Sequence, residues 1–190
     1  MDESGGLLYL GSILVPCSVI DVEGDTLVAV SSSPVTISAI DVSDPARPRL
    51  RSQREAPAAF CGTGASQAEV NDVNLVQGIA YVDHDQALSM FALEGHDWPW
   101  HLGCHDTGAD RSVVDGALMI RAGVGWDEEL QVLDVSQPSS PVVLGTAPSQ
   151  NASGIALDHG YVFVAVWHRI RIYDVRTPAH PEEVSSIVAP

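Results

Sequence analysis

The stretch Asp41-Val42-Ser43-Asp44-Pro45-Ala46-Arg47-Pro48 recurs along this chain. Its copies are Asp134-Val135-Ser136-Gln137-Pro138-Ser139-Ser140-Pro141 and Asp174-Val175-Arg176-Thr177-Pro178-Ala179-His180-Pro181, which begin 40 residues apart. A degenerate copy at 92–99 has Ala92 in place of the first Asp and keeps the final Pro. Each copy follows an alternating apolar run, and its last Pro opens another run. A period near 40 residues in an all-β pattern is typical of propeller blades or solenoid rungs.

Each repeat unit contains the same four pieces, which predict four strands. The first is an apolar run that ends at a Gly, where a hairpin turn needs positive φ, and Asp115-Gly116 is the strongest such signal. A β-rich strand follows, and then an alternating run such as 169–174, which places Ile170 and Ile172 on one face. The fourth strand begins at the last Pro. Because Pro cannot donate a hydrogen bond to a ladder, the fourth strand should lie at the outer edge and the first innermost.

We therefore predict an all-β fold, a β-propeller of about four four-stranded antiparallel blades within a single domain, 1–190. The blades are expected at 13–52, 68–103, 111–146 and 153–188, with 1–12 as the outer strand of a preceding or closing blade. An insertion rich in Ala, Gly and Ser around 56–66 lengthens the first interval. Two arrangements stay open: four blades that close one ring, or four blades that form part of a larger propeller.

The recurring motif is best interpreted as a sequence that shapes the turn between the third and fourth strands. Its first Pro (Pro45, Pro138 and Pro178) presets φ for the turn between the third and fourth strands. The Asp and the Ser or Thr beside it are expected to bond backbone N–H groups inside that turn. This interpretation is preferred to a catalytic Asp.

Composition limits the partners. The formal net charge is −16 and the sequence pI is about 4.4, and all nine basic side chains are Arg. Such a surface repels phosphate backbones, so nucleic acid is excluded as a partner. No apolar run is long enough to span a bilayer, and the acidic amino terminus does not resemble an export signal.

Three cysteines, Cys17, Cys61 and Cys104, are widely spaced and form no CxxC pair. An odd number excludes a fully paired set of disulfides within the chain. At most one bridge is expected, and buried free thiols are the preferred interpretation.

The repeat resembles the LVIVD repeat of bacterial and archaeal β-propellers. The resemblance is carried by Ile40 with the motif at 41–48, by Leu130-Gln131-Val132-Leu133-Asp134-Val135-Ser136, and by Ile172-Tyr173-Asp174-Val175. It extends over nearly the whole chain, although Ala92 departs from the pattern, so the turn of the second unit is expected to be built differently. The resemblance implies a propeller, often on exported or surface proteins, and carries over no shared catalytic residue. If this chain is a fragment of such a protein, an extracellular or cell-surface location is expected.

One rim of the predicted propeller collects the loops between strands two and three and the links between blades. It is the expected binding face, because functional residues concentrate on loops that a rigid scaffold presents. The candidate residues on this rim are Asp83, His84, Asp85, His105, Trp126, Asp127, Trp167 and His168. Trp98-Pro99-Trp100-His101 is assigned to the outer strand, where packing between blades is preferred to a sugar-stacking patch.

Three functions compete for this rim. A zinc-type site of His84, His105, His168 and neighbouring carboxylates is chemically suitable but has no compact ligand spacing, and Cys104-His105-Asp106 is a weak signal. Hydrolase or lyase chemistry would use the His and carboxylate side chains as acid and base. Non-catalytic binding, with Trp126 and Trp167 as apolar anchors, needs no catalytic motif and no ligand spacing in the sequence. We predict a binding or scaffold module for protein or cell-surface partners, without a cofactor, and keep the propeller enzyme as the alternative.

Overall fold

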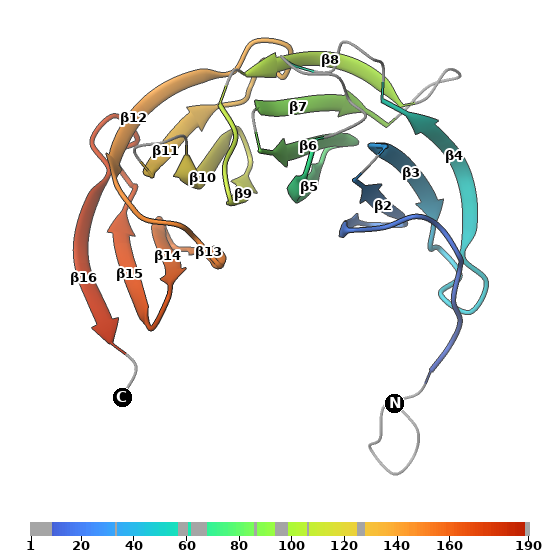
Figure 1. The fold of residues 1–190 in the computed structure, drawn as a ribbon, viewed down its shortest axis with the longest axis horizontal. Helices are drawn as coiled ribbons and strands as arrows, with labels where there is room; N and C mark the ends of the chain where they lie inside the picture. The colour runs from blue at the N-terminus through green and yellow to red at the C-terminus, as the bar shows by residue number, and fades with distance from the viewer. Residues whose placement is uncertain are drawn as a thin grey trace.

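The computed structural model describes residues 9–32, 34–56, 61, 68–85, 87–93, 99–105, 107–124 and 128–188. In this part of the chain there are sixteen strands and no helix, arranged as four sheets of four consecutive antiparallel strands. Figure 1 shows the four sheets side by side along an arc, as blades of a β-propeller. The predicted fold class is confirmed.

Each blade contains four strands in chain order. Blade one is β1 (Val19–Glu23), β2 (Thr26–Ser31), β3 (Thr36–Asp41) and β4 (Arg49–Glu55), and blade two is β5 (Val70–Val76), β6 (Ile79–His84), β7 (Ala87–Ala92) and β8 (Trp100–His105). Blade three is β9 (Arg111–Asp115), β10 (Leu118–Val124), β11 (Glu129–Asp134) and β12 (Val142–Pro148), and blade four is β13 (Gly154–Asp158), β14 (Tyr161–Val166), β15 (Arg169–Asp174) and β16 (Glu182–Val188). The first strand of each blade lines the inside of the arc and the fourth, Pro-led strand lies outermost, as predicted (Figure 1).

The turns have the chemistry that the sequence predicts. The four glycines that end the first strands have positive φ: Gly24, Gly78, Gly116 and Gly160. In the Asp-to-Pro motif, the first Asp accepts a hydrogen bond from the backbone N–H two residues on, at 3.0 Å for Asp41, 2.8 Å for Asp134 and 3.0 Å for Asp174. The motif therefore closes the turn between the third and fourth strands. The corresponding turn of blade two at 94–98 lies outside the described residues.

Apolar side chains between neighbouring blades form the core. Successive residues of a strand point to opposite faces, so each blade presents one set of side chains to the blade before it and one to the blade after it. In β14, Val162, Val164 and Val166 are buried against blade three, whereas Phe163 and Ala165 face the other way and are only half-buried.

The outer strands also fix the spacing of the blades. A Cβ added to Gly103 of β8 would lie 2.7 Å from the carbonyl oxygen of Ser139, and one on Gly145 of β12 would lie 2.5 Å from that of Pro178. Both glycines thus sit directly against the Asp-to-Pro turn of the next blade. Gly11 lies against the turn of blade one in the same way, because a Cβ there would be 2.7 Å from the carbonyl oxygen of Ala46. Gly11 thus contacts the turn of blade one as Gly103 and Gly145 contact the turns of blades three and four. Residues 1–8 of the outer strand predicted at 1–12 lie outside the described residues.

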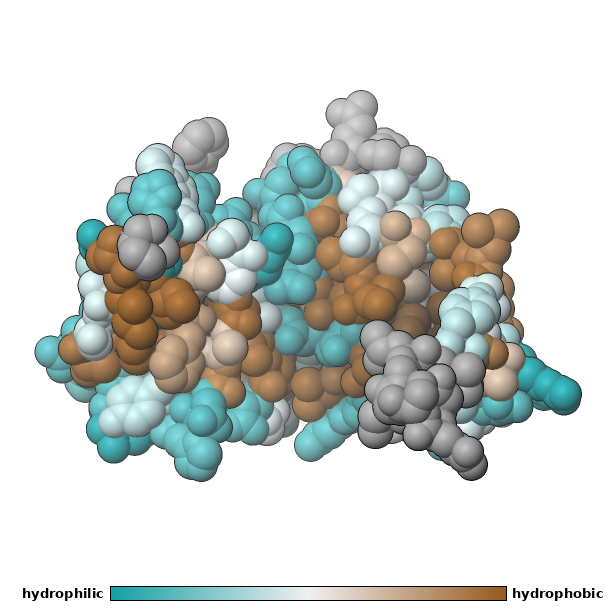
Figure 2. Space-filling model, turned by 90° about the horizontal axis from the view of Figure 1, so that it is seen from below, coloured by the Kyte–Doolittle hydropathy of each residue, from teal (hydrophilic) through white to brown (hydrophobic). Residues whose placement is uncertain are grey.

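The arc is open between blade four and blade one (Figure 1). Of the two arrangements that the sequence leaves open, four blades closing one ring is not what the structure shows. The terminal faces beside the opening are apolar: Ile170 and Ile187 of blade four are 41% and 56% exposed, and Ile20 and Val22 of blade one are 59% and 54% exposed. Figure 2 looks into the opening and shows apolar surface on both sides of it. Among the described residues, no helix has the length and apolar character needed to cross a membrane.

Candidate functional site

The structure places the predicted rim residues in three different situations. Asp83 and His84 end strand β6 and are fully buried, so the expectation that they lie in exposed loops is wrong. Asp85 follows them in the turn with a partly exposed side chain, and His105 ends β8 in a half-buried position. Trp167 and His168 form the exposed turn between β14 and β15 in blade four. Trp126 and Asp127 lie outside the described residues.

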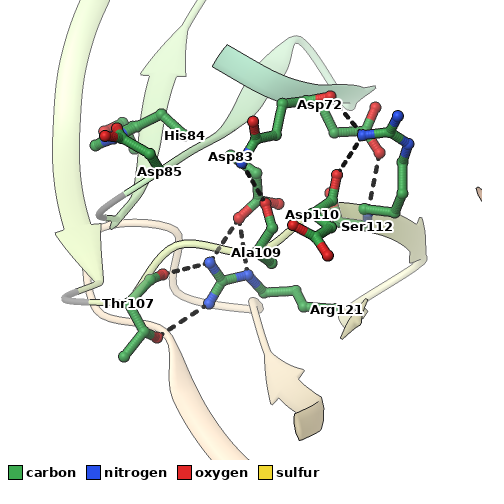
Figure 3. Close-up of polar contacts among 12 residues, drawn as sticks. Asp72, Asp83, His84, Asp85, Thr107, Ala109, Asp110, Ser112 and Arg121 are labelled. Carbon is green, nitrogen blue, oxygen red and sulfur yellow. Dashed lines mark hydrogen bonds and ion pairs between the residues drawn. The ribbon is translucent and has the colours of Figure 1, made fainter. Parts of the chain in front are cut away.

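Asp83 is buried because it pairs with an arginine of the next blade. Arg121 of β10 is fully buried and donates from Nε (2.9 Å) and from Nη2 (2.6 Å) to Oδ1 of Asp83. The same guanidinium donates from Nη1 to the hydroxyl of Thr107 (3.4 Å) and from Nη2 to the Thr107 carbonyl oxygen. Figure 3 shows Arg121 extended between Asp83 and Thr107. The pair holds blade two to blade three and has no solvent-exposed surface through which to reach a substrate.

Carboxylates in the inner strands or just before them hold the blades together in a second way. Each accepts a hydrogen bond from a backbone N–H of the next blade or of the link into it: Asp21 from Leu75 (2.6 Å), Asp72 from Ser112 (2.9 Å) and Asp110 from Ala152 (2.9 Å). Burial raises the pKa of Asp72 above its usual value, against the lowering effect of its hydrogen bonds to Ser112 and Val73. Asp72, Asp110 and Ser112 lie beside the Asp83–Arg121 pair in Figure 3.

Cys61 and Cys104 form a disulfide that joins the long insertion to strand β8. The preference for buried free thiols is therefore wrong for these two residues, and Cys17, which is free, is exposed. Three cysteines allow at most one bridge within the chain, and the structure contains one. Sequence spacing could not identify the pair, because Cys61 lies in an insertion that has no counterpart in the other repeats.

Polar side chains surround this sulfur pair. Nε2 of His101 lies 3.6 Å from Sγ of Cys61 and 3.4 Å from Sγ of Cys104. Ser89 donates from Oγ to Sγ of Cys61 at 2.8 Å, and Nε2 of His84 lies 3.2 Å from the same hydroxyl. Burial lowers the pKa of both His101 and His84, which favours neutral imidazoles at pH 7.

A small cleft opens between blades one and two beside His101. Its cavity volume is about 110 Å³, and its lining is mainly apolar: Ile37, Arg54, Glu55, Ala56, Phe91, Pro99, Trp100 and His101. Trp100 is 60% exposed, so the expectation that this tryptophan packs between blades is wrong for most of its surface. His101 packs against Phe91 with ring centroids 5.2 Å apart.

The sequence pattern did not predict that Arg121, Asp72, Asp110 and His101 belong to these clusters. A usable signal existed for Arg121, a charged residue inside the apolar run 118–124 of a predicted central strand. For His101 the signal was its place three residues before Cys104.

Comparison with known families matches the LVIVD repeat at residues 122–147 and 149–188. These residues belong to blades three and four. The predicted resemblance is thus confirmed for the carboxy-terminal part of the chain, where the Asp-to-Pro motifs at 134–141 and 174–181 lie.

Solved structures with the same fold are other β-propellers of low sequence identity. A Lactobacillus plantarum protein has a TM-score of 0.69 at 13% identity, over 95% of this chain and 57% of its own. BamB from Moraxella catarrhalis has a TM-score of 0.61 at 11% identity, over 97% and 56%. The N-terminal domain of Nup159 has a TM-score of 0.58 at 14% identity, over 92% and 45%. The chain thus spans about half the length of these structures, and the likeness concerns the fold. No curated protein matches the sequence.

Proposed function

We propose that this LVIVD propeller is a non-catalytic binding module that holds a protein or cell-surface partner on the rim carrying Trp167. The observation that supports the proposal is the solvent exposure of Trp167. Its side chain is 83% exposed, and its backbone has φ of 52°. The φ value belongs to the tight turn, since Gln77, Glu128 and His159 have values of 52°, 51° and 50°. What favours a binding role is therefore the exposure of the large indole side chain.

The surroundings of Trp167 suit a protein contact. His168 stacks edge-on against the indole with ring centroids 6.4 Å apart, and Gln150, Val166 and Arg169 complete a shallow cavity of about 250 Å³ beside it. An exposed tryptophan in a polar setting is the usual anchor of a protein interface. The net charge of −16 favours a partner with a basic surface.

Two further observations support the proposal: one concerns the compartment and the other concerns protein binding. The disulfide between Cys61 and Cys104 is typical of oxidising compartments. In a solved structure of the same fold, S. cerevisiae Dbp5 is bound to Nup159, so a propeller of this shape serves there in a protein complex.

The enzyme alternative receives less support from the geometry. Two of the residues predicted for an acid–base pair, Asp83 and His84, are fully buried, and Asp83 is paired with Arg121. The exposed candidates Trp167 and His168 lie two blades away from them.

A photo-cross-linking amino acid at position 167 tests the proposal in extracts of the organism from which the sequence comes. We expect one defined protein or surface component to be cross-linked from position 167 but not from position 159, an exposed turn residue on the opposite rim that also has positive φ. Unlabelled chain should compete for the cross-link, and chain with Trp167→Ala should not. Equal products from both positions, or competition by Trp167→Ala, would overturn the proposal.

A further inference from the structure

Three side chains beside the cleft place metal-binding atoms close together. The sulfurs of Cys61 and Cys104 and one ring nitrogen of His101 all lie within 4.8 Å of one another. His101 and Cys104 are both in strand β8, so the scaffold fixes two of the three donors. Phe91 packs against the imidazole and holds its orientation.

The two nitrogen-to-sulfur distances fit a tetrahedral metal site. With Zn–S bonds of about 2.3 Å and Zn–N bonds of about 2.0–2.1 Å, the N–S edge of a tetrahedron is about 3.5 Å. Nε2 of His101 lies 3.6 Å and 3.4 Å from the two sulfurs. Only the sulfurs must move apart to admit an ion, which becomes possible once the bond between them is reduced.

The surroundings also favour thiolates at this position. The Ser89 hydroxyl already donates a hydrogen bond to Sγ of Cys61 at 2.8 Å, and this donor would stabilise negative charge on the sulfur. Two thiolates and one divalent cation carry no net charge, so the ion-bound site could remain partly buried without an uncompensated charge. The set of two sulfurs and one imidazole is one that zinc accepts, with a fourth position left for water.

We propose that Cys61, His101 and Cys104 bind one zinc-class ion when the chain is reduced, and that the disulfide and the metal complex are alternative states of one site. A small-molecule dithiol supplies two electrons and two protons, which break the S–S bond and leave two thiols. Binding of the ion then releases both thiol protons to solvent and forms two metal–sulfur bonds. The inference is independent of the Trp167 rim.

Co²⁺ is a suitable probe because it replaces zinc and absorbs visible light. The experiment uses the full chain carrying Cys17→Ser, which removes the free exposed thiol. After reduction, we expect one Co²⁺ per chain with thiolate-to-metal charge-transfer bands and the d–d bands of a tetrahedral ion, and Zn²⁺ should remove these bands. The oxidised chain should show none of them. Absence of thiolate bands in the reduced chain would overturn the proposal.

Two controls separate this site from adventitious binding. His101→Asn should weaken Co²⁺ binding at least about tenfold, since even loss of residues that support a ligand costs that much. Without any substitution, Zn²⁺ should protect Cys61 and Cys104 of the reduced chain from alkylation and leave Cys17 reactive, as mass spectrometry would show. Equal alkylation of all three thiols in the presence of Zn²⁺ would contradict the proposal. This measurement does not depend on the folding of any variant, because it uses the unsubstituted chain.

Discussion

At the residue scale, the Asp83–Arg121 pair shows how a buried charge becomes part of a blade interface. The guanidinium reaches Asp83 and Thr107, so the charges neutralise each other and three of its donor groups are used. Oδ2 of Asp83 has no hydrogen-bond partner among the described residues. In blade one the residue in the place of Asp83 is Val30, so the fold itself does not need a charge there.

Removing one member of this pair should cost more than removing both. Arg121→Met leaves the Asp83 carboxylate buried without its cation, and we expect a loss of about 3–5 kcal/mol in the free energy of unfolding. The double variant Asp83→Val with Arg121→Met should recover most of that loss, because no buried charge remains. Urea denaturation of the three proteins measures both steps. A loss of under about 1 kcal/mol in the single variant would show that the carboxylate finds another partner.

The buried histidine predicts how stability depends on pH. Burial lowers the pKa of His84 from its ordinary value of 6.5 in the folded chain, whereas the unfolded chain titrates near that value. Below pH 6.5 the unfolded state therefore binds a proton that the folded state does not, and stability falls as pH falls from 6.5 toward the folded pKa. His101 shifts in the same direction.

We expect the unfolding free energy of the native chain to decrease between pH 7 and pH 5.5, and the decrease to be smaller in His84→Asn. Urea denaturation at several pH values checks this. An identical pH dependence in the two proteins would mean that His84 is protonated without cost in the folded state.

At the scale of the element, the outer strand and the Asp-to-Pro turn act as a matched pair. The carboxylate–N–H bond closes the turn, and the glycine of the preceding outer strand lies against that turn's carbonyl groups. Side-chain and backbone hydrogen bonds to Ser43 hold the pKa of Asp41 at about 2, and the Arg176 side chain does the same for Asp174. The turn is thus built around an ionised carboxylate.

We expect substitution of a glycine that contacts such a turn to lower the free energy of unfolding, and substitution of a glycine away from the turns to leave it unchanged. Gly145→Ala would place a methyl group 2.5 Å from the carbonyl oxygen of Pro178, so blades three and four must shift, at a cost of about 1–3 kcal/mol. Gly154→Ala is the matched control, because the nearest atom to its new methyl, Cβ of Ala165, is 3.8 Å away and its effect should stay within about 0.5 kcal/mol. Equal thermal stability of the two variants would mean that the outer strand tolerates movement.

The sequence predicts this level of structure well, since each signal is local. Gly at the hairpins, Pro at the outer edge and Asp in the turn act on backbone within a few residues. The candidate site was harder to predict, because its contacts are long-range: Asp83 and Arg121 are 38 positions apart, and Cys61 and Cys104 are 43 apart. The prediction of exposed rim residues was wrong at Asp83 and His84. The apolar run ends at Val82, so the sequence assigns these polar residues to a loop, whereas strand β6 extends through His84 and buries both.

At the scale of the whole molecule, the arc leaves two apolar faces uncovered. Ile170 and Ile187 are opposite one another on the free face of blade four, in the register where blade three buries Leu130 against blade four. Exposed apolar area of this kind usually marks an interaction surface.

We expect residues 1–190 to self-associate as their concentration rises, as analytical ultracentrifugation would show. Ile170→Glu with Ile187→Glu should shift the equilibrium to the monomer, since the charges could not be buried without partners. Val142→Glu is the matched control: this residue is 57% exposed on outer strand β12, away from the opening, and should leave association unchanged. A native chain that is monomeric at every concentration would show that the terminal faces do not attract one another.

The opening in the arc has a further consequence for how the molecule unfolds. A closed ring gives every blade two neighbours, but here blades one and four each have one. The free energy of unfolding is therefore the sum of the contributions of the single blades and of the interfaces between successive blades, as in a linear repeat protein. Unfolding can then begin at either end and spread inward. Backbone amides of β14 in blade four should exchange with deuterium faster than those of β6 and β10 in blades two and three. A terminal blade can unfold while the interface between blades two and three stays intact.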